Sequence, residues 1–310
     1  MSSAALTSVA SASTSHEWRL ATQKRRVEMS DQRALATTFR ELHHSARPLL
    51  LVNAWDVVSA RIVEDSGAPA IATTSAGVAW AEGFADGEQI TREHMLSRVA
   101  HIARSVNVPV SADLEGGYGE TVADARTTAL GAIECGAVGL NFEDAHPNGQ
   151  GLLDIDAQVA RIKAMRDAAT DAGVPLVINA RTDTFLADVG PDDAWRLAES
   201  LRRGNEYLAA GADCVFVPGV TDAATIQALV AGLRGPLNVL AGAATPSIAA
   251  LRELGVARVS LGSGAMSVVL AEFRNLVRVL GETGDFAFLS QRMQHGAVNA
   301  MLTRSTSASA

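Results

Sequence analysis

Short apolar runs alternate with longer amphipathic stretches through most of the chain. The runs are rich in β-branched side chains, as expected of strands that are buried on both faces. The stretches between them space their apolar positions as helices do when one side covers a sheet. Eight such runs span residues 48–54, 69–75, 108–114, 137–143, 175–181, 214–219, 236–242 and 258–264.

This alternation predicts parallel strands that are joined by helices. Eight units in about 235 residues favour closure into a (β/α)8, or TIM-type, barrel. A glycine such as Gly67 or Gly173 stands just before many of the runs, where it can end the preceding helix. The runner-up is a doubly wound open sheet, which would carry a glycine-rich turn after its first strand. The first run instead ends in Asn-Ala-Trp-Asp, so the barrel is favoured.

We expect one barrel domain over residues 31–300, with extra helices at its C-terminal end. Residues 1–30 are rich in Ser, Ala and Thr and lack the continuous apolar core of a secretory signal. A disordered extension is therefore favoured over an organelle transit peptide or a translation start at Met29. Residues 301–310 have a similar composition and are expected to form a flexible tail.

Composition and charge narrow the classes of partner. The net charge is −8, from 26 basic and 34 acidic residues, and no basic block predicts a nucleic-acid partner. No apolar run approaches the ~20 residues that span a bilayer, so no membrane partner is expected. The two cysteines, Cys135 and Cys214, lie far apart in sequence and fit a reduced, cytoplasmic location better than a disulfide scaffold.

Acidic residues follow two neighbouring runs, where the active site of such a barrel lies. Asp113, Glu115, Glu143 and Asp144 end the third and fourth runs, and Asp86 lies in the loop after the second. Carboxylates crowded on one rim raise each other's pKa, which a cation would relieve. Oxygen ligands without His or Cys favour Mg²⁺, with Mn²⁺ as the alternative. Each acid could instead cap a helix, an interpretation that we favour for Asp144.

Two further groups at the strand ends could bind an anionic substrate. Arg181 ends the fifth run and could offer its planar guanidinium to a carboxylate or an enolate oxygen, or it could simply pair with Asp183. The residues from Thr74 to Gly77 form a predicted turn of small side chains, with hydroxyl and backbone N–H groups suited to an anionic end group. An ordinary tight turn is the alternative there.

At these residues the chain resembles the isocitrate lyase and phosphoenolpyruvate mutase family. The resemblance runs from about Arg47 to Gly281 and is carried by the segments NAWDVVSARIVEDSGAPAIATTSAG, SADLEGGYGE, GLNFEDA and INARTD. Each segment is weakly specific alone, but their order along an eight-unit pattern is specific. The resemblance implies a barrel that binds Mg²⁺ and a 2-oxo acid, or its enolate, at its mouth.

The resemblance also implies a role for each matching residue. Asp113 would be the direct metal ligand, and Glu115, where the family often has Asp, would hold a metal-bound water. Glu143 and Asp86 would be further carboxylates around the metal waters. On the substrate side, Thr74, Ser75 and Ala76 would hold the carboxylate and carbonyl, Trp55 would lie beside the substrate, and Arg181 would neutralise oxyanion charge.

The loop after the fourth run departs from the lyases of the family. It has the sequence EDAHPNGQGLLDID, without the Lys-Lys/Arg-Cys-Gly-His segment whose Cys donates the proton. Pro218 stands where those lyases have Glu, so cleavage of isocitrate or 2-methylisocitrate is not expected. The mutases of the family have a longer loop with its own Lys and Asn residues; Asn148 is present here, but the loop looks short for a phosphonomutase. His146 could donate a proton near neutral pH and is a candidate catalytic acid, with an ordinary loop histidine as the alternative.

These residues predict a Mg²⁺-dependent lyase that cleaves a carbon–carbon bond of a small 2-oxo or 2-hydroxy dicarboxylate, such as an oxaloacetate-like acid, through a metal-stabilised enolate. One alternative is an enzyme of the P–C bond, either a phosphonomutase or a phosphonopyruvate hydrolase. Another is a non-catalytic barrel that binds a 2-oxo acid. The resemblance further implies a homo-oligomer, a dimer or tetramer, whose last helices are exchanged between neighbours.

Overall fold

The computed structural model describes residues 30–146 and 151–303. Nearly all of the predicted N-terminal extension and most of the predicted tail lie outside the described residues. Within them, nine parallel strands form one sheet in the order β1-β9-β8-β7-β6-β5-β4-β3-β2. The strands are β1 (Leu49–Leu51), β2 (Asn53–Ala54), β3 (Ile71–Thr73), β4 (Val110–Asp113), β5 (Gly139–Glu143), β6 (Val177–Arg181), β7 (Cys214–Phe216), β8 (Leu237–Leu240) and β9 (Arg258–Ser260).

The first apolar run closes this sheet into a barrel. Its first half, β1, pairs with β9, and its second half, β2, pairs with β3. Each of the eight predicted runs therefore contributes to the wall, and the predicted (β/α)8 barrel is confirmed. In parallel strands of one barrel all the carboxyl ends meet at one rim, which brings distant parts of the sequence together.

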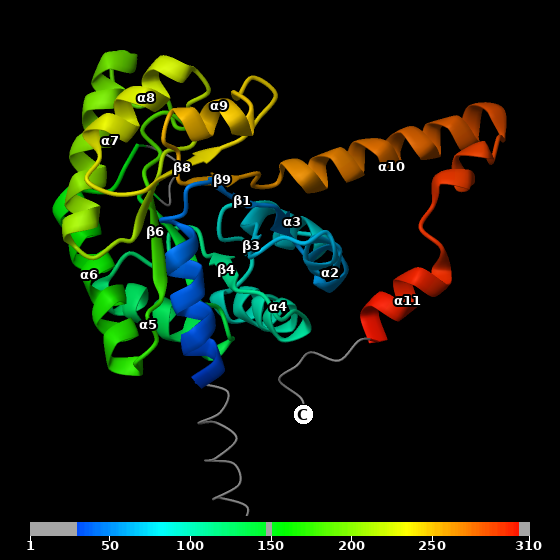
Figure 1. The fold of residues 1–310 in the computed structure, drawn as a ribbon, viewed down its shortest axis with the longest axis horizontal. Helices are drawn as coiled ribbons and strands as arrows, with labels where there is room; N and C mark the ends of the chain where they lie inside the picture. The colour runs from blue at the N-terminus through cyan, green and yellow to red at the C-terminus, as the bar shows by residue number, and fades with distance from the viewer. Residues whose placement is uncertain (1–29, 147–150, 304–310) are drawn as a thin grey trace, which may run out of the picture.

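Helices surround the barrel and alternate with its strands (Figure 1). A helix over residues 30–42 precedes the first strand. The others are α2 (Val57–Asp65), α3 (Ser75–Ala81), α4 (Arg92–Ser105), α5 (Val122–Glu134), α6 (Ile155–Ala172), α7 (Asp193–Ala209), α8 (Ala223–Gly232), α9 (Ile248–Glu253), α10 (Gly264–Thr283) and α11 (His295–Thr303), with a 3-10 helix, η1 (Ala287–Gln291), before the last.

Side chains in the sequence start and stop these helices. Asp56 begins α2 by accepting a hydrogen bond from the Ser59 backbone N–H at 2.7 Å, while the Ser59 hydroxyl receives the Asp56 N–H. Gly173 ends α6 with a left-handed φ of 68°, as its place before the fifth run predicts. Such caps satisfy the backbone groups that a helix leaves unpaired at its ends.

The first helix closes the amino-terminal end of the barrel. Its Phe39 is fully buried and packs into the strand layer beside Gly139 of β5. A Cβ atom at Gly139 would lie 2.6 Å from the Phe39 Cε1 atom, so this aromatic plug needs a glycine opposite it. The amino-terminal end of the barrel is therefore filled, and space for a ligand remains at the carboxyl ends of the strands.

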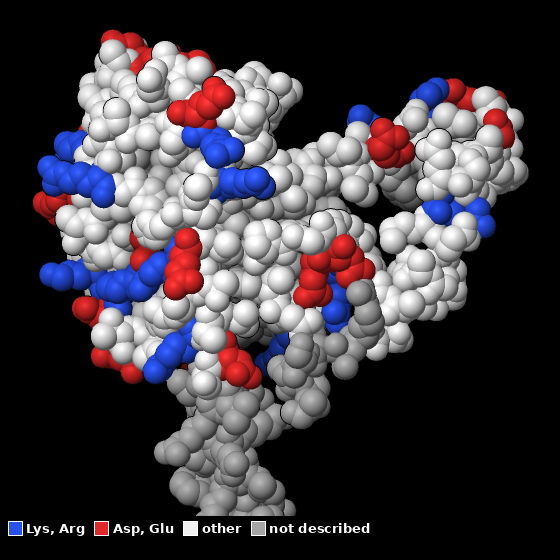
Figure 2. All heavy atoms as spheres, in the orientation of Figure 1, with Lys and Arg blue, Asp and Glu red and all other residues white. Residues whose placement is uncertain are grey.

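The C-terminal segment leaves the barrel. Figure 1 shows α10 projecting to one side, after which the chain turns back and places α11 below it, where it contacts α2. Figure 2 shows acidic and basic side chains interspersed on the visible face, with no large patch of one sign. Among the described residues, no helix has both the length and the apolar composition needed to cross a membrane.

Candidate active site

A small cavity lies at the carboxyl ends of the strands. Its volume is about 150 Å³, and residues from most of the strands or the loops that follow them line it. The structure thus brings together Asp113, Arg181 and the 74–76 segment, predicted from the strand ends, with Asp86, predicted from the loop after the second run. Residues that the sequence analysis did not connect with a site also line it: Asn53, Asn141, Leu186, Phe216, Leu240, Ser260 and Gly262.

Asp113, at the end of β4, is the most constrained carboxylate of the cavity. It is buried, and its Oδ2 accepts hydrogen bonds from the Ser75 backbone N–H at 2.9 Å and the Ser75 hydroxyl at 3.0 Å. Its Oδ1 accepts from the Asn141 side chain at 3.3 Å, and its own N–H donates to the Thr73 hydroxyl at 2.9 Å. These neutral donors fix the direction of the carboxylate without neutralising its charge.

The predicted turn at residues 74–77 is the first turn of α3. Thr74 is its N-cap, with the side-chain oxygen 3.4 Å from the Gly77 backbone N. A Cβ atom at Gly77 would lie 2.6 Å from the Thr74 methyl group and 3.0 Å from the Trp55 Cβ, so this start of the helix tolerates little beyond glycine. The backbone N–H groups that we expected to face an anion therefore belong to the first turn of α3. One of them, the Ser75 N–H, donates to Asp113.

The acidic residues of the rim raise each other's pKa. Burial, together with the charges of Asp113 and Asp86, raises the pKa of Glu115 to about 7. Partial burial and the charge of Asp113 likewise raise the pKa of Asp86. Oxygen donors that repel each other in this way are chemically suited to a hard divalent cation such as Mg²⁺.

The described residues contain no group of three or more His, Cys, Asp or Glu side chains already arranged around one point. A Mg²⁺ ion often takes one or two protein carboxylates and keeps several waters. The donor set therefore fits a site with Asp113 as the direct ligand and the other acids acting through water.

Glu115 is tied to the loop that carries Asp86. Its Oε2 accepts from the Glu88 backbone N–H at 2.8 Å, and the Glu88 carboxylate accepts from the Tyr118 N–H at 2.7 Å. Glu88, Glu115 and Tyr118 all have left-handed φ angles, of 55°, 49° and 57°. Side-chain-bearing residues hold that conformation only where the surroundings impose it. The sequence carries no signal for Glu88 beyond an acid two residues after Asp86, so its part in this loop was not predicted.

Arg181 is engaged by two carboxylates. Its Nη1 lies 2.7 Å from Glu143 Oε2, and its Nε and Nη2 lie 2.5 and 2.7 Å from the two oxygens of Asp183. Burial alone would lower the pKa of Arg181, but Glu143 and Asp183 raise it above its usual value. The guanidinium also lies over the Phe216 ring, 5.9 Å from its centroid, and it lines the cavity. It is thus held in place with a permanent charge.

Four predicted site residues are not among those that line the cavity: Trp55, Glu115, Glu143 and His146. Trp55 is half-buried and packs against the core, and Glu143 lies behind Arg181. His146 is half-buried at the edge of the described segment, where its backbone N–H donates to the Gly151 carbonyl at 3.0 Å. Asn148, in the same loop, lies outside the described residues.

Asp144 has a structural place, but it does not cap a helix as we favoured, because α6 is capped by Asp154 instead. It is fully buried and accepts from the Tyr207 hydroxyl at 2.6 Å, the Asp183 N–H at 3.0 Å and the Arg203 guanidinium at 3.2 Å. The network ties β5 to α7 and to the loop that orients Arg181. Its members support the rim from outside the cavity.

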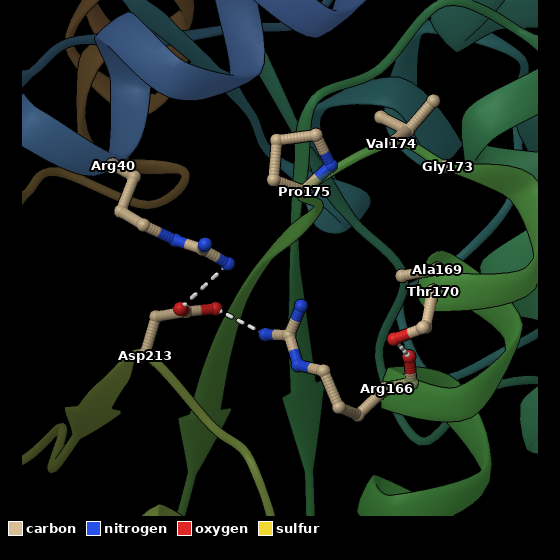
Figure 3. Close-up of a pocket in the computed structure, with 8 residues that line it drawn as sticks. All are labelled: Arg40, Arg166, Ala169, Thr170, Gly173, Val174, Pro175 and Asp213. Atoms are coloured by element: carbon tan, nitrogen blue, oxygen red, sulfur yellow. Dashed lines mark hydrogen bonds and ion pairs between the residues drawn. The ribbon is translucent and has the colours of Figure 1, made fainter.

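A second, larger hollow lies at the opposite end of the barrel (Figure 3). It has a volume of about 470 Å³ and is lined by Arg40, Arg166 and Asp213, among others. Asp213 bridges the two arginines, at 3.0 Å from Arg40, and Arg166 also donates to the Gly211 and Leu176 carbonyls. Asp213 thus pairs with both arginines of this hollow, and the amino-terminal end of such barrels serves stability.

A TIM-type barrel with an acidic, oxygen-only rim and a clamped arginine defines the class of this protein. The family model described as phosphoenolpyruvate phosphomutase matches residues 39–280, so the chain belongs to that family. An uncharacterized protein of Mycobacterium tuberculosis is 34% identical over 79% of this chain and 89% of its own length. The oxaloacetate decarboxylase of Ectopseudomonas mendocina is 30% identical over 69% of this chain and 72% of its own.

Solved structures agree with this membership. One is a Burkholderia cenocepacia protein provisionally described as a phosphonomutase, with 45% identity, a TM-score of 0.75, and coverage of 78% of this chain and 98% of its own. Another is 2,3-dimethylmalate lyase, with 27% identity, a TM-score of 0.75, and coverage of 86% and 94%. The predicted membership of the isocitrate lyase and phosphoenolpyruvate mutase family is confirmed, and with it the prediction of a lyase-type enzyme.

Proposed function

We propose that this protein is a Mg²⁺-dependent lyase that cleaves a carbon–carbon bond to C3, the carbon next to the carbonyl carbon, of a small, oxaloacetate-like 2-oxo dicarboxylate. The observation that carries the proposal is the single cavity that combines Asp113, Asp86 and Arg181 with the start of α3. An anionic substrate needs positive charge in such an acidic cavity. Arg181 supplies part of it, and a bound Mg²⁺ would supply the rest.

Different residues of the cavity would bind the metal, orient the substrate and stabilise the developing charge. Asp113, with Asp86 and Glu115 acting through water, would hold Mg²⁺, which when bound polarises the carboxylate and carbonyl oxygens of the substrate. Thr74, Ser75 and Ala76 would orient the substrate carboxylate at the start of α3. Arg181, held rigid by its own carboxylate partners, would stabilise the negative charge that develops on the carbonyl oxygen.

The size of the cavity supports a small substrate. At about 150 Å³ it is well below the ~300–1,000 Å³ of sites for larger ligands. Phe216, Pro218 and Leu240 provide apolar walls beside the charged groups. Pro218 also means that no carboxylate stands at that position to serve a tricarboxylate substrate. These features favour a short dicarboxylate over isocitrate or 2-methylisocitrate.

The proton donor is proposed to be His146. It lies in the loop after β5, and general acids positioned in such loops reach a substrate when the loop packs over the barrel mouth. The relatives named oxaloacetate decarboxylase support a reaction on a four-carbon 2-oxo acid. Because CO₂ leaves without needing an acid, the donor acts afterwards, when the remaining three-carbon fragment takes up a proton at C3.

A second candidate is cleavage of the P–C bond of phosphonopyruvate. It is favoured by the 45% identity with the Burkholderia cenocepacia protein provisionally described as a phosphonomutase. Phosphonopyruvate has the same 2-oxo acid end as oxaloacetate, so the metal and Arg181 would bind both. The two functions differ in the group on C3, and hence in the products.

The decisive experiment offers the purified protein oxaloacetate, phosphonopyruvate and 2-methylisocitrate with Mg²⁺ and follows all products by NMR. Pyruvate and CO₂ formed from oxaloacetate faster than with Mg²⁺ alone would support a decarboxylase, which breaks the C3–C4 bond. Oxalate and acetate would instead indicate hydrolysis of the C2–C3 bond. Phosphoenolpyruvate, or pyruvate with phosphate, would support the second candidate. Asp113→Ala is the control and should abolish turnover. Turnover of none of the three, or equal turnover by that variant, would refute the proposed site.

We also propose that a second copy of the chain covers the projecting C-terminal segment. Exposed apolar side chains run along α10 and η1, an arrangement that marks a surface for protein association. The described residues that make up this surface are Val268, Val269, Leu270, Phe273, Val277, Phe286, Leu289 and Met293, each at least 41% exposed. The same surface repeated on two copies would bury both, as in a homo-oligomer.

A further inference from the structure

A fully buried arginine lies beneath the cavity. Arg258 begins β9 and points into the barrel, above the Phe39 plug, with its guanidinium carbon 6.0 Å from the ring centroid. It takes no part in the substrate or metal roles proposed above. Its exposed fraction is 0%, and burial lowers its pKa to about 10.

Among the described residues no carboxylate pairs with Arg258. Its hydrogen bonds go to neutral oxygens, Asn141 Oδ1 at 3.1 Å and Ser260 Oγ at 3.4 Å, and its Nη1 has no partner there. Arg203, another buried arginine, pairs with both Asp144 and Glu199, whereas Arg161 resembles Arg258 in donating only to neutral oxygens. A buried charge without an opposite charge is costly, so such a residue calls for a reason beyond packing.

Asn141 connects this charge to the cavity. Its Oδ1 accepts from Arg258 and, at 2.7 Å, from the Asn179 amide. Two donors on that oxygen fix the orientation of the amide, because a flipped amide would turn its NH₂ group toward both of them. The NH₂ group must therefore face the other way, where it donates to Asp113 Oδ1 at 3.3 Å.

We propose that Arg258 is a positioning residue for the metal carboxylate Asp113, acting through Asn141. The buried cation locks the amide, the amide directs its N–H at one oxygen of Asp113, and Ser75 holds the other. This inference rests on the proposed function only in that it needs a divalent cation at Asp113.

The test measures metal binding without substrate. Mn²⁺ titrations followed by electron paramagnetic resonance, with Mg²⁺ competition, give the dissociation constants of the wild type and of Arg258→Met, Arg258→Lys and Asn141→Ala. Removing a group that orients a metal ligand costs roughly 10–100-fold in metal affinity. We therefore expect at least about tenfold weaker binding for Arg258→Met and for Asn141→Ala, with Arg258→Lys recovering much of the loss.

Matched measurements separate positioning from general damage. Phe39→Leu disturbs the packing of the same barrel floor but keeps the cation, so it should lower thermal stability and leave the metal affinity unchanged. If Arg258→Met does not fold, Asn141→Ala carries the test, because it breaks the link while Arg258 remains. Wild-type affinity in a folded Arg258→Met or Asn141→Ala variant would overturn this proposal alone. Failure of the wild-type protein to bind either metal would overturn the proposed function itself.

Discussion

Replacing Glu115 by Gln should make the metal-free protein more stable at high pH and leave its stability at low pH almost unchanged. In the folded protein, burial and the Asp113 and Asp86 charges raise the pKa of Glu115 from 4.5 to about 7. A carboxyl with a raised pKa binds its proton more tightly when folded, so the free energy of unfolding falls as pH rises from 4.5 through 7. Gln carries no charge at any pH, so the free energy of unfolding of the variant does not fall for this reason.

The size of the effect follows from the shift. At ~1.4 kcal/mol per pKa unit, ionised Glu115 costs the folded state about 3 kcal/mol once the pH is above 7. Gln keeps an oxygen to accept the Glu88 N–H, now 2.8 Å from the Glu115 carboxylate, so little else is lost. For a barrel of this length roughly 2 °C accompanies each kcal/mol, which predicts a gain of about 6 °C in Tm at pH 8.

The assay is thermal unfolding, followed by circular dichroism in EDTA, of the wild type and Glu115→Gln at pH 4.5 and pH 8. Glu253→Gln is the matched control, because Glu253 is exposed on α9 and its charge is surrounded by water. Its Tm difference from the wild type should be the same at both pH values. A Glu115→Gln difference that is also independent of pH would refute the reasoning, because the acidic residues of the rim would then not repel each other.

Four further predictions concern the proposed metal, the proposed proton donor His146, the buried Tyr207 and the projecting helix α10. Mg²⁺ at 100 times its Kd should stabilise the wild type at pH 8 by about 2.7 kcal/mol, seen as a higher Tm that EDTA reverses; an unchanged Tm would contradict a metal site. His146→Ala should lower kcat by about 10²-fold or more with KM nearly unchanged in steady-state assays, and equal losses of binding and turnover would contradict an acid role. Tyr207→Phe removes a 2.6 Å hydrogen bond to a buried carboxylate and should cost about 1.5–3 kcal/mol in urea unfolding, whereas Tyr118→Phe loses a 3.4 Å contact and should cost less than about 1 kcal/mol; the reverse order would be contrary to the geometry. Phe273→Arg with Val277→Arg should lower the mass measured by light scattering, and an unchanged mass would rule out association through α10.

The fold could be predicted from the sequence because parallel barrel strands are buried on both faces. That burial requires continuous apolar runs, which are visible in a single sequence, and each of the eight predicted runs contains barrel strand. The strand ends were equally visible. Asp113 and Arg181 were placed correctly at the cavity because a residue that follows a strand lies at the carboxyl rim whatever the register.

The state of each side chain at that rim depended on neighbours that are distant in sequence. Trp55 and His146 follow strands as predicted but are not among the residues that line the cavity. Glu115 is held by Glu88, from the loop after another strand, and both adopt left-handed backbone angles that no local pattern announces. Sequence position gives the height of a residue in the barrel, while packing between loops decides where its side chain points.

The pattern of apolar runs thus determined the barrel and the rim at which its strands end, and the acids that follow those runs in the sequence predicted an oxygen-only site there. The tertiary structure alone decided which groups touch. Arg258 begins the last strand and Asn141 lies in the fifth, 117 positions away, yet they meet because barrel closure and strand register turn both side chains inward at the same level. Hydrogen bonding acts over about 3 Å of space, and separation along the chain carries no information about that distance.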